Sequence, residues 1–308
     1  MEKVDILLSV FNPNIDFLIK QLQSLNNQTY HNIELFIFDD CIDKRVDRQL
    51  IKRYFNRFPI TFVPNLNNNI GFFRAFEYLL KQSNGKYIAL CDQDDVWHND
   101  KIEKSIKVLK DDNSLLVASD HRIINQNDEV VSESARKNDI AKNYNRWKTG
   151  DDIAKYNLFV TYAIGNCLVA DGDFARSTIP FGAAQDKWLI NCAAIEGIVS
   201  FIDEPLVDYR RHGNNVSGFL AGVNTKKEYY DYRIIVHENI YKEVLKKYPK
   251  WKDRDEVGRF INARKTHNRK QLRRYSYLAP DIVKFELLIS YMPSSIFKLM
   301  LKIIRLKK

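Results

Sequence analysis

The sequence is poor in the residues and segments that mark several protein classes. Glycine and proline number only 11 and 8 among 308 residues, which excludes a collagen-like or low-complexity chain. No charge-free apolar run approaches the roughly 20 residues of a membrane-spanning helix. Residues 1–10 also lack the long apolar core of a signal peptide. We therefore expect neither export nor insertion across a bilayer.

Cysteine is also scarce, and its spacing argues against a disulfide framework. The four cysteines, Cys41, Cys91, Cys167 and Cys192, lie far apart and form no Cys-x-x-Cys pair. We expect buried free thiols, which suit the reducing cytosol.

The charge is unevenly distributed along the chain. The formal net charge is +9. Residues 226–308 hold 22 Lys or Arg against 9 Asp or Glu, whereas residues 1–225 hold 26 against 30. A mildly acidic body with a strongly basic tail favours an anionic partner, such as a membrane surface, nucleic acid or a phosphorylated substrate.

Strand and helix patterns alternate through the first 118 residues. Apolar runs typical of buried strands occupy residues 4–10, 33–38, 60–63, 87–90 and 115–118. Helical spacing of apolar residues occupies 16–27, 46–58, 71–82 and 101–110. This repetition predicts an α/β fold with a Rossmann-like, mostly parallel sheet and helices on both faces. Beyond it we expect an irregular loop over 120–160, a strand over 160–170, a helix over 186–195 and basic helices after 226.

Polar residues follow three of these strands. Asn12 follows the first strand, Asp39 and Asp40 end the second, and residues 92–95 (DQDD) follow a later one. Ligands of such sheets bind beyond the carboxyl ends of the strands. The carboxylates of residues 92–95 suit Mg²⁺ or Mn²⁺, and a helix cap is the alternative. Asp39 and Asp40 suit a nucleobase or ribose, or an Asx turn.

Several familiar catalytic motifs are absent. The sequence contains no GxGxxG after its first strand and no GxxxxGK[ST], which disfavours a dinucleotide-dependent dehydrogenase and a P-loop NTPase. It also contains no HExxH and no GxSxG, so zinc proteases and serine hydrolases lose support.

Five short segments occur in a fixed order along the first hundred residues. They are SVFN at 9–12, DD at 39–40, NIGFFRA at 69–75, NGKYIAL at 84–90 and DQDDVW at 92–97. This order resembles the family 2 glycosyltransferases with the GT-A fold, over residues 1–215. The DQDDVW segment resembles the bacterial rhamnosyltransferase-like branch, as does YRRHGNN at 209–215.

The resemblance implies a nucleotide-sugar donor, a divalent metal ion (Mn²⁺ or Mg²⁺) and inversion at the anomeric carbon. It places the metal on Asp94. His212 is either a further metal ligand or a cationic group for the leaving diphosphate, and a structural hydrogen-bonding histidine is the alternative. The resemblance assigns the donor site to these residues: Phe11, Asn12, Asp39, Asp40, Asn69, Gly71, Arg74, Asp92, Gln93, Arg210 and Arg211. Cys41 and Ile42 depart from the small Gly-Ser pair that often follows the acidic pair. Arg210 and Arg211 would neutralise the leaving diphosphate, or are solvated surface charges.

An inverting transferase also needs a base for the acceptor hydroxyl. The family supplies an Asp at the start of a helix, and the matching residue is Asp186, although Gln185 replaces the usual Glu or His. A helix cap is again the alternative. By the same resemblance, Gly165, Asn166 and Trp188 line the acceptor pocket.

The C-terminal segment, residues 282–308, is basic and apolar. Lys298, Lys302 and Arg305 share a helical face, which suits a helix lying in the interface of an anionic membrane. The alternative is a helix packed on the domain. Arginines and tyrosines at residues 273–277 suit RNA, but no RNA-binding signature supports that partner.

Together these patterns predict a catalytic domain over residues 1–225 and a basic helical extension over 226–308. The expected activity is sugar transfer to a surface polysaccharide or lipid-linked acceptor, at the inner face of the cell membrane. A sugar nucleotidyltransferase, or a non-catalytic glycan- or membrane-binding partner in a synthesis complex, is the alternative.

Overall fold

The structure is a computed structural model that describes residues 1–138, 147–212, 220 and 222–306. The chain forms two compact units. The first comprises Met1–Asp152 and Thr161–His212, and the second comprises Ile153–Val160 and Gly213–Lys308.

The first unit is built on one mixed sheet, in the order β3-β2-β1-β4-β8-β6-β9-β5, with β7 paired to β6. The strands are β1 (Val4–Val10), β2 (Ile33–Asp39), β3 (Ile60–Phe62), β4 (Tyr87–Cys91), β5 (Val96–Trp97), β6 (Leu116–Ile124), β7 (Val130–Ser132), β8 (Leu168–Asp171) and β9 (Val199–Arg210). The predicted parallel pairing is found among the four neighbouring strands β3, β2, β1 and β4, and between β6 and β9. β8 runs antiparallel to β4 and β6, and β5 runs antiparallel to β9.

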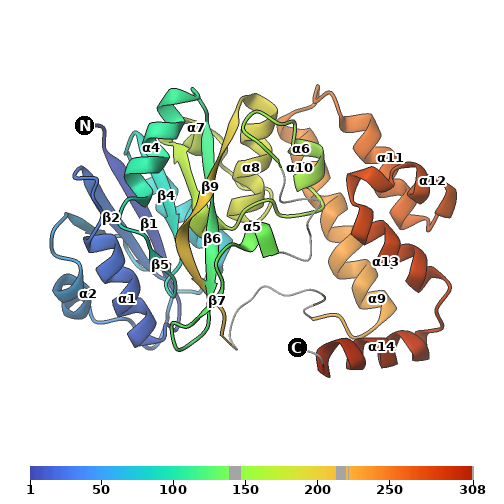
Figure 1. Ribbon diagram of the computed structural model, residues 1–308, viewed down its shortest axis with the longest axis horizontal. Coiled ribbons are helices and arrows are strands. Elements are labelled where there is room, and N and C mark those ends of the chain that lie inside the picture. Colours follow the sequence, from blue (N-terminus) through green and yellow to red (C-terminus); the bar gives the residue numbers. More distant parts are fainter. Residues whose placement is uncertain (139–146, 213–219, 221, 307–308) are drawn as a thin grey trace. The chain divides into compact units, whose positions relative to one another are not determined.

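Helices cover this sheet (Figure 1). They are α1 (Ile15–Asn26), α2 (Arg48–Tyr54), α3 (Phe72–Gln82), α4 (Lys101–Asp111), α5 (Ala135–Asn138), α7 (Gly172–Ser177) and α8 (Gln185–Glu196). α1 begins where the Asn14 side chain accepts hydrogen bonds from the N–H groups of Asp16 and Phe17. Its residues Leu18 and Leu22 then fall on one buried face, at the spacing of successive helical turns.

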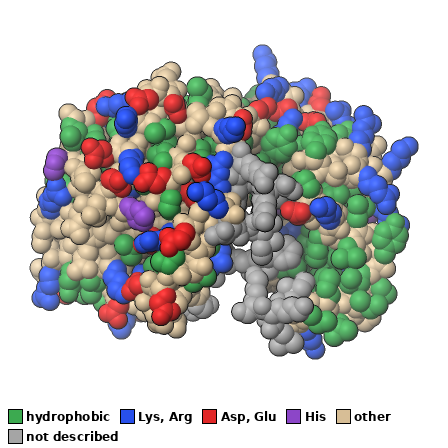
Figure 2. Space-filling view, viewed as in Figure 1, with side chains coloured by type: hydrophobic (Ala, Val, Ile, Leu, Met, Phe, Trp, Pro, Cys, Tyr) green, Lys and Arg blue, Asp and Glu red, His purple; other side chains and the backbone are tan. Residues whose placement is uncertain are grey.

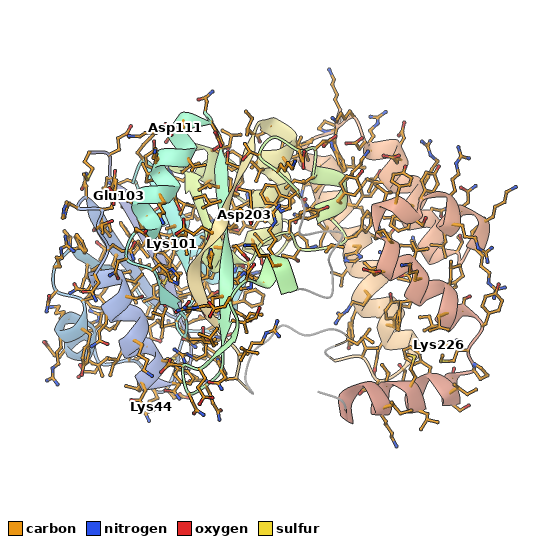
Figure 3. All side chains as sticks on the ribbon, in the orientation of Figure 1. Lys44, Lys101, Glu103, Asp111, Asp203 and Lys226 are labelled. Carbon is orange, nitrogen blue, oxygen red and sulfur yellow. The ribbon has the colours of Figure 1, made fainter. Side chains whose placement is uncertain are left out.

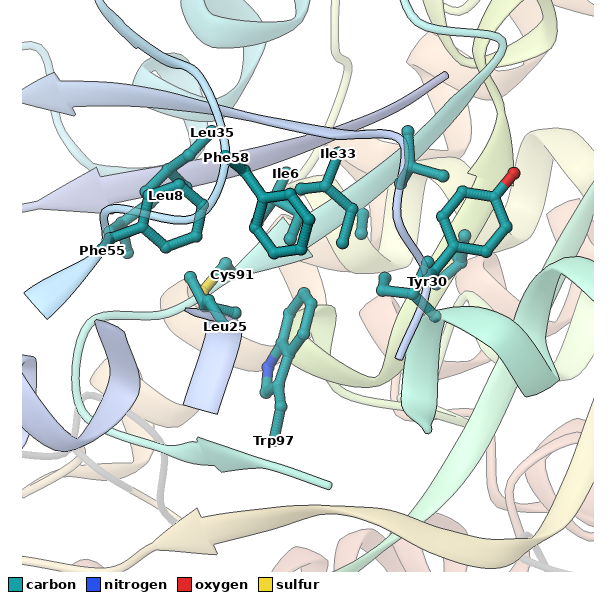
Figure 4. Close-up of a cluster of buried hydrophobic side chains, with 14 of the residues drawn as sticks. Ile6, Leu8, Leu25, Tyr30, Ile33, Leu35, Phe55, Phe58, Cys91 and Trp97 are labelled. Atoms are coloured by element: carbon teal, nitrogen blue, oxygen red, sulfur yellow. The ribbon is translucent and has the colours of Figure 1, made fainter. Parts of the chain in front are cut away.

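The core of the first unit lies between the sheet and these helices. Figure 4 shows Ile6 and Leu8 of β1 near Leu25, Phe55 and Trp97, within one cluster of buried side chains. Leu25 and Leu8 are fully buried, and Trp97 is 2% exposed. Burying such side chains contributes about 1.5–3 kcal/mol each, so the core fixes the strand ends that carry the polar residues.

The second unit is helical in its described residues. Its helices are α6 (Ala154–Asn157), α9 (Lys226–Tyr229), a π-helical segment (Tyr230–Ile235), α10 (Val236–Lys247), α11 (Arg254–Lys265), α12 (Arg269–Arg274), α13 (Pro280–Ser290) and α14 (Ser294–Leu306). Phe297 and Leu301 of α14 are buried against a cluster that includes Ile234 and Ile289. Within the described ranges, no helix has the length and apolarity to cross a membrane.

Two secondary-structure expectations were wrong, one strand was missed, and the expectation about cysteine is confirmed. Residues 120–160 are not a continuous loop, because β6 extends to Ile124 and β7 pairs with it. Residues 160–170 do not form one strand, since a 3₁₀ turn at Gly165–Cys167 precedes β8. β9 was not predicted. All four cysteines are buried and none forms a disulfide within the described residues, as expected.

Candidate active site

The carboxyl ends of three neighbouring parallel strands bring the predicted polar residues to one edge of the sheet. β1 lies between β2 and β4, with Val10 opposite Asp39 and Leu8 opposite Cys91. The polar segments that follow the three strands therefore start side by side. This edge is where ligands of α/β sheets bind.

The Gln93 side chain joins the segments that follow β1 and β4. Its Oε1 accepts from the N–H of Phe11 at 2.8 Å, and its Nε2 donates to the Phe11 carbonyl at 3.0 Å. The next residue, Asn12, has a φ of 44°, which asparagine tolerates better than most side chains. Its N–H donates to Sγ of Cys41 at 3.1 Å, and the Cys41 N–H donates to Asp39 at 3.0 Å. Cys41 therefore helps to hold the strand-end loops together.

Asp40 organises the start of α3. Its buried carboxylate accepts from Asn69 Nδ2 at 2.8 Å and from the N–H groups of Ile70 and Gly71, both at 3.0 Å. Gly71 precedes α3 with a φ of 80°, in the left-handed region that favours glycine. Both oxygens of the carboxylate that we assigned to the donor base are thus engaged by the protein's own donors.

Asp95 and Asn166 form the buried support of the DQDD segment. The Oδ1 of Asp95 accepts from the N–H of Arg210 at 2.7 Å, and its Oδ2 accepts from Asn166 Nδ2. The Asn166 Oδ1 accepts from the indole of Trp97 at 2.6 Å and from the N–H of Asp92 at 3.4 Å. Burial, together with the neighbouring carboxylates, raises the pKa of Asp95 well above its usual range. Asn166, expected in the acceptor pocket, is 1% exposed and holds this segment in place.

Arg210 fixes the other side of the same segment. Its side chain is fully buried, and its Nε donates to the Asp94 carbonyl at 2.8 Å. Its Nη1 donates to Oδ1 of Asp128 at 2.5 Å, and the guanidinium stacks on the Phe17 ring at 4.4 Å. Although burial raises the pKa of Asp128, hydrogen bonds from Lys20 and Arg210 lower it overall. Asp128 is therefore a stable anion that keeps the guanidinium oriented.

Asp94 and His212 meet at this edge of the sheet. The distance from His212 Nε2 to Asp94 Oδ2 is 2.8 Å, and the imidazole lies 5.5 Å from the Phe17 ring. Both side chains are partly exposed, at 15% for His212 and 21% for Asp94. They are thus oriented by their neighbours while remaining open to a ligand.

The residues around Asp94 fit a divalent cation. Burial raises the pKa of Asp92 to about 7, and the negative charges of Asp94 and Asp186 add to the effect. A divalent cation would remove this cost of clustered negative charge, and carboxylate with imidazole is a donor set that Mn²⁺ accepts. In the described part of the chain, no three His, Cys, Asp or Glu side chains converge on a metal position. Further ligands would have to come from the diphosphate of the donor and from water.

Asp186 lies in the first turn of α8, beside Gly165. A side-chain carbon at Gly165 would lie 3.4 Å from Gln185 Nε2 and 3.8 Å from Cβ of Asp186, so the buried Gly165 packs at ordinary contact distance against the start of α8. The Asp186 Oδ1 accepts the N–H of Lys187 at 2.6 Å. Burial raises the pKa of Asp186, and burial lowers the pKa of Lys187 to about 8. A carboxylate with a raised pKa is a stronger proton acceptor than an ordinary aspartate.

Three of the remaining sequence-predicted residues have different surroundings. The side chains of Arg74 and Arg211 are exposed. Trp188 is 2% exposed, and its indole donates to the Thr178 carbonyl at 2.8 Å. A buried indole with its N–H satisfied offers no surface to an acceptor, so its place in that pocket has no geometric support. Residues 213–215 of the YRRHGNN segment lie outside the described residues.

Two residues that shape this edge, Phe17 and Asp128, were not proposed as site residues, and Asp95 was considered only as part of the DQDD run. Phe17 packs against both Arg210 and His212, but its sequence pattern indicated only the apolar face of α1. Asp95 could be noticed in the DQDD run, although its buried supporting role could not. Asp128 lies in a polar stretch without a recognisable pattern, with a φ of 67°.

Comparison with known proteins identifies the family. The sequence profile of glycosyl transferase family 2 matches residues 5–168, more than half of the chain. An uncharacterized glycosyltransferase from Nostoc sp. is 24% identical over 239 residues, which are 73% of this chain and 70% of the relative. In a longer relative from Rickettsia bellii, the matched region is only 17% of its length.

Solved structures show the same fold. Residues 1–349 of S. aureus TarS, in complex with UDP-GlcNAc, superpose with a TM-score of 0.58 at 15% identity, over 84% of this chain and 70% of that one. The mannosyltransferase PcManGT from Pyrobaculum calidifontis, in complex with GDP-Man and Mn²⁺, gives 0.54 at 15% identity, over 97% and 84%. The predicted GT-A fold is confirmed, and the chain belongs to glycosyl transferase family 2, a family of glycosyltransferases.

Proposed function

We propose that the protein is an inverting, metal-dependent transferase. It moves a sugar from a nucleotide-diphosphate donor, dTDP-rhamnose or a UDP-sugar, to a hydroxyl of a bacterial surface polysaccharide or lipid-linked oligosaccharide. The observation that carries this proposal is the pairing of Asp94 with His212, at 2.8 Å, in the segments that follow β4 and β9.

Asp94 and His212 are the proposed metal ligands. A Mn²⁺ or Mg²⁺ ion held there would neutralise the charge that develops on the departing diphosphate. Both proposed ligands are already oriented by protein contacts. The Asp94 carbonyl accepts a hydrogen bond from Arg210, and the His212 imidazole packs against Phe17. Arg210 itself is therefore a positioning residue in this proposal, since its buried guanidinium already contacts protein groups.

Asp186 is the proposed base. As the acceptor oxygen forms its bond to the anomeric carbon, its proton passes to the Asp186 carboxylate, and the bond to the diphosphate oxygen breaks on the opposite face. This displacement inverts the anomeric centre. Asp186 is only partly buried, and its raised pKa favours accepting the proton.

The donor would lie across the strand ends. Gln93 holds the segment after β1 and Asp40 holds the start of α3, so we assign them the positioning of the donor site. The exposed side chains of Phe11 and Arg74 remain candidates for direct donor contact. The structural neighbours bound to UDP-GlcNAc and to GDP-Man with Mn²⁺ support a nucleotide-diphosphate sugar as the class of donor.

A donor screen by titration calorimetry tests this proposal. dTDP-rhamnose, UDP-glucose, UDP-GlcNAc and GDP-mannose would each be titrated with and without Mn²⁺. We expect one nucleotide sugar to bind only with Mn²⁺, and we expect Asp94→Ala to abolish that binding. Asp111→Asn is the matched control, because Asp111 is an exposed carboxylate at the end of α4 (Figure 3). Absence of binding to all four donors by the folded protein would refute donor recognition.

We also propose that the second unit contacts the membrane surface. Ile296, Leu299 and Ile303 of α14 are 50%, 58% and 48% exposed, although Phe297 and Leu301 of the same helix are buried. One side of α14 therefore packs on the second unit, and its other side exposes a stripe of apolar side chains. Exposed lysines at 298 and 302 flank the stripe, which suits a helix resting on anionic lipid.

A further inference from the structure

A cavity of about 650 Å³ lies within the helical unit. None of the residues used in the proposed transfer lines it. Its lining combines cationic and apolar side chains from α9, the π-helical segment, α12 and α13. The cations are Lys226, Lys227 and Arg269, and apolar walls come from Tyr230, Ile234 and Ile289. This volume is within the range of pockets that hold small organic ligands.

The charge at the cavity favours an anion. Arg269 is held in one orientation, because its guanidinium lies 3.6 Å from the centre of the Tyr291 ring and its Nε donates to Ser290 Oγ at 3.1 Å. Lys226 lies at the start of α9 (Figure 3), and its Nζ donates to the carbonyl of Met292 in the turn between α13 and α14. Lys227 is 84% exposed and pairs with Asp231 of its own helical stretch.

The acidic residue of the lining does not cancel this charge. Glu286 is buried, and its carboxylate accepts from Arg264 at 2.7 Å and from the Tyr229 hydroxyl at 3.0 Å. A buried carboxylate already paired with a guanidinium contributes no free negative charge to the cavity. The cations that remain favour phosphate, which accepts several charge-assisted hydrogen bonds at once.

The apolar walls add a second requirement. Ile234 and Ile289 are 2% and 8% exposed and belong to the buried cluster that includes Phe297. Leu288, at the end of α13, and Tyr291, the residue after α13, are 57% and 64% exposed. Figure 2 shows hydrophobic and cationic side chains gathered on the helical unit. Tyr230 of the lining is only half-buried, so a hydrocarbon chain would cover apolar surface that a free phosphate would leave in water.

We infer that this cavity binds a single phosphorylated lipid, with its phosphate at Lys226, Lys227 and Arg269 and its chain along Tyr230 and Ile289. The inference goes beyond the proposed transfer, because every residue that carries it lies outside the family match at residues 5–168. Two sources share this chemistry: a membrane phospholipid with acyl chains, and a prenyl-linked phosphate of the kind that carries saccharides.

Four soluble probes distinguish these sources in calorimetric titrations of the full chain. They are dihexanoyl phosphatidic acid, farnesyl monophosphate, dihexanoyl phosphatidylcholine and inorganic phosphate. We expect one of the first two to bind at one molecule per chain, at least tenfold more tightly than the last two. The tighter of the first two identifies the source. Equal binding of inorganic phosphate, or equal binding of phosphatidylcholine, would overturn the inference.

Two variants locate the ligand in the cavity. Arg269→Gln removes a charged donor, and Ile289→Phe fills the apolar end, so we expect each to weaken binding about tenfold. Lys246→Gln is the control, because Lys246 is an exposed lysine on α10 that does not line the cavity. Unchanged binding by both variants, with an unchanged melting temperature, would place the lipid elsewhere. Donor binding by the same variants should be normal, which separates this result from failure of the transferase proposal.

Discussion

His212 Nε2 lies 2.8 Å from Asp94 Oδ2, although 118 residues separate the two in the sequence. His212 follows the end of β9 and Asp94 follows β4, so their meeting depends on the order of strands in the sheet. The described part of the chain holds a similar pair away from this edge. There, His98 Nε2 lies 3.0 Å from Asp208 Oδ1, which provides an internal comparison.

His212→Ala should weaken Mn²⁺ binding in the presence of the donor about tenfold, because it removes one proposed ligand and leaves Asp94. His98→Ala should leave the Mn²⁺ affinity unchanged, since His98 pairs with Asp208 outside the DQDD segment. Manganese affinity can be measured by electron paramagnetic resonance of the free ion. Equal losses in the two variants would contradict a ligand role for His212.

Asp186→Asn should lower the transfer rate by about 10²–10⁴-fold, because an amide cannot accept the acceptor proton. Donor affinity should stay within twofold of the wild type. In the wild type the rate should fall as the pH drops through the raised pKa of Asp186, and this acidic limb should vanish in the variant. Rates and donor affinity measured from pH 4 to 9 test both expectations. A variant that retains its turnover would rule out Asp186 as the base.

The same substitution should stabilise the fold at neutral pH. Burial raises the pKa of Asp186 in the folded state, so the folded chain holds this proton more tightly than the unfolded chain. The resulting stability is present at low pH and is lost as the pH rises through the raised pKa. Asp186→Asn removes that loss, and its melting temperature should exceed that of the wild type at pH 7. The difference should disappear at acidic pH below the unfolded-state pKa, near 3.9.

The N-terminal half of the sheet could be predicted from the sequence because its strands are buried on both faces. The β1 prediction matched its observed bounds, Val4–Val10, and β4 differed by one residue. Continuous apolar runs between amphipathic helices are a clear signal of parallel strands. The same signal placed the polar strand ends at one edge, where the structure has them.

The antiparallel half gave weaker signals. β9 carries Asp203, Glu204 and Pro205 in its middle, a run that argues against a strand. The structure accommodates it where the register with β6 shifts, between Ser119 and Asp120, and there Pro205 lies opposite Asp120. A register shift of this kind depends on the partner strand, so local sequence could not reveal it.

Prediction of the site had a similar limit. The resemblance located Asp94, His212 and Asp186, whose roles remain to be tested. It could not show that the polar atoms of Asn166 and Asp40 form hydrogen bonds within the protein, because their partners come from distant segments of the chain. Those contacts arise only when the strand order is known.

Asn166→Ala should destabilise the first unit by about 3 kcal/mol, because it leaves the Trp97 indole and a buried oxygen of Asp95 without their partner. Asn26→Ala is the comparison, since Asn26 also joins two segments but does so at the surface, and it should cost less than about 1 kcal/mol. Denaturant unfolding monitored by tryptophan fluorescence measures both. A similar loss for the two variants would show that the burial of Asn166 is unimportant.

Leu299→Glu should weaken binding to anionic vesicles about tenfold, because a side chain that would enter the lipid interface becomes charged. Leu299 is 58% exposed, so the fold should tolerate the change. Binding to vesicles of phosphatidylglycerol and phosphatidylcholine can be followed by co-sedimentation. Val131→Glu is the matched control, because Val131 is 62% exposed but lies on β7 of the first unit.

Added salt should also weaken binding, since Lys298 and Lys302 would face anionic headgroups. Equal binding by wild type and Leu299→Glu would leave the apolar stripe of α14 without a role at the membrane.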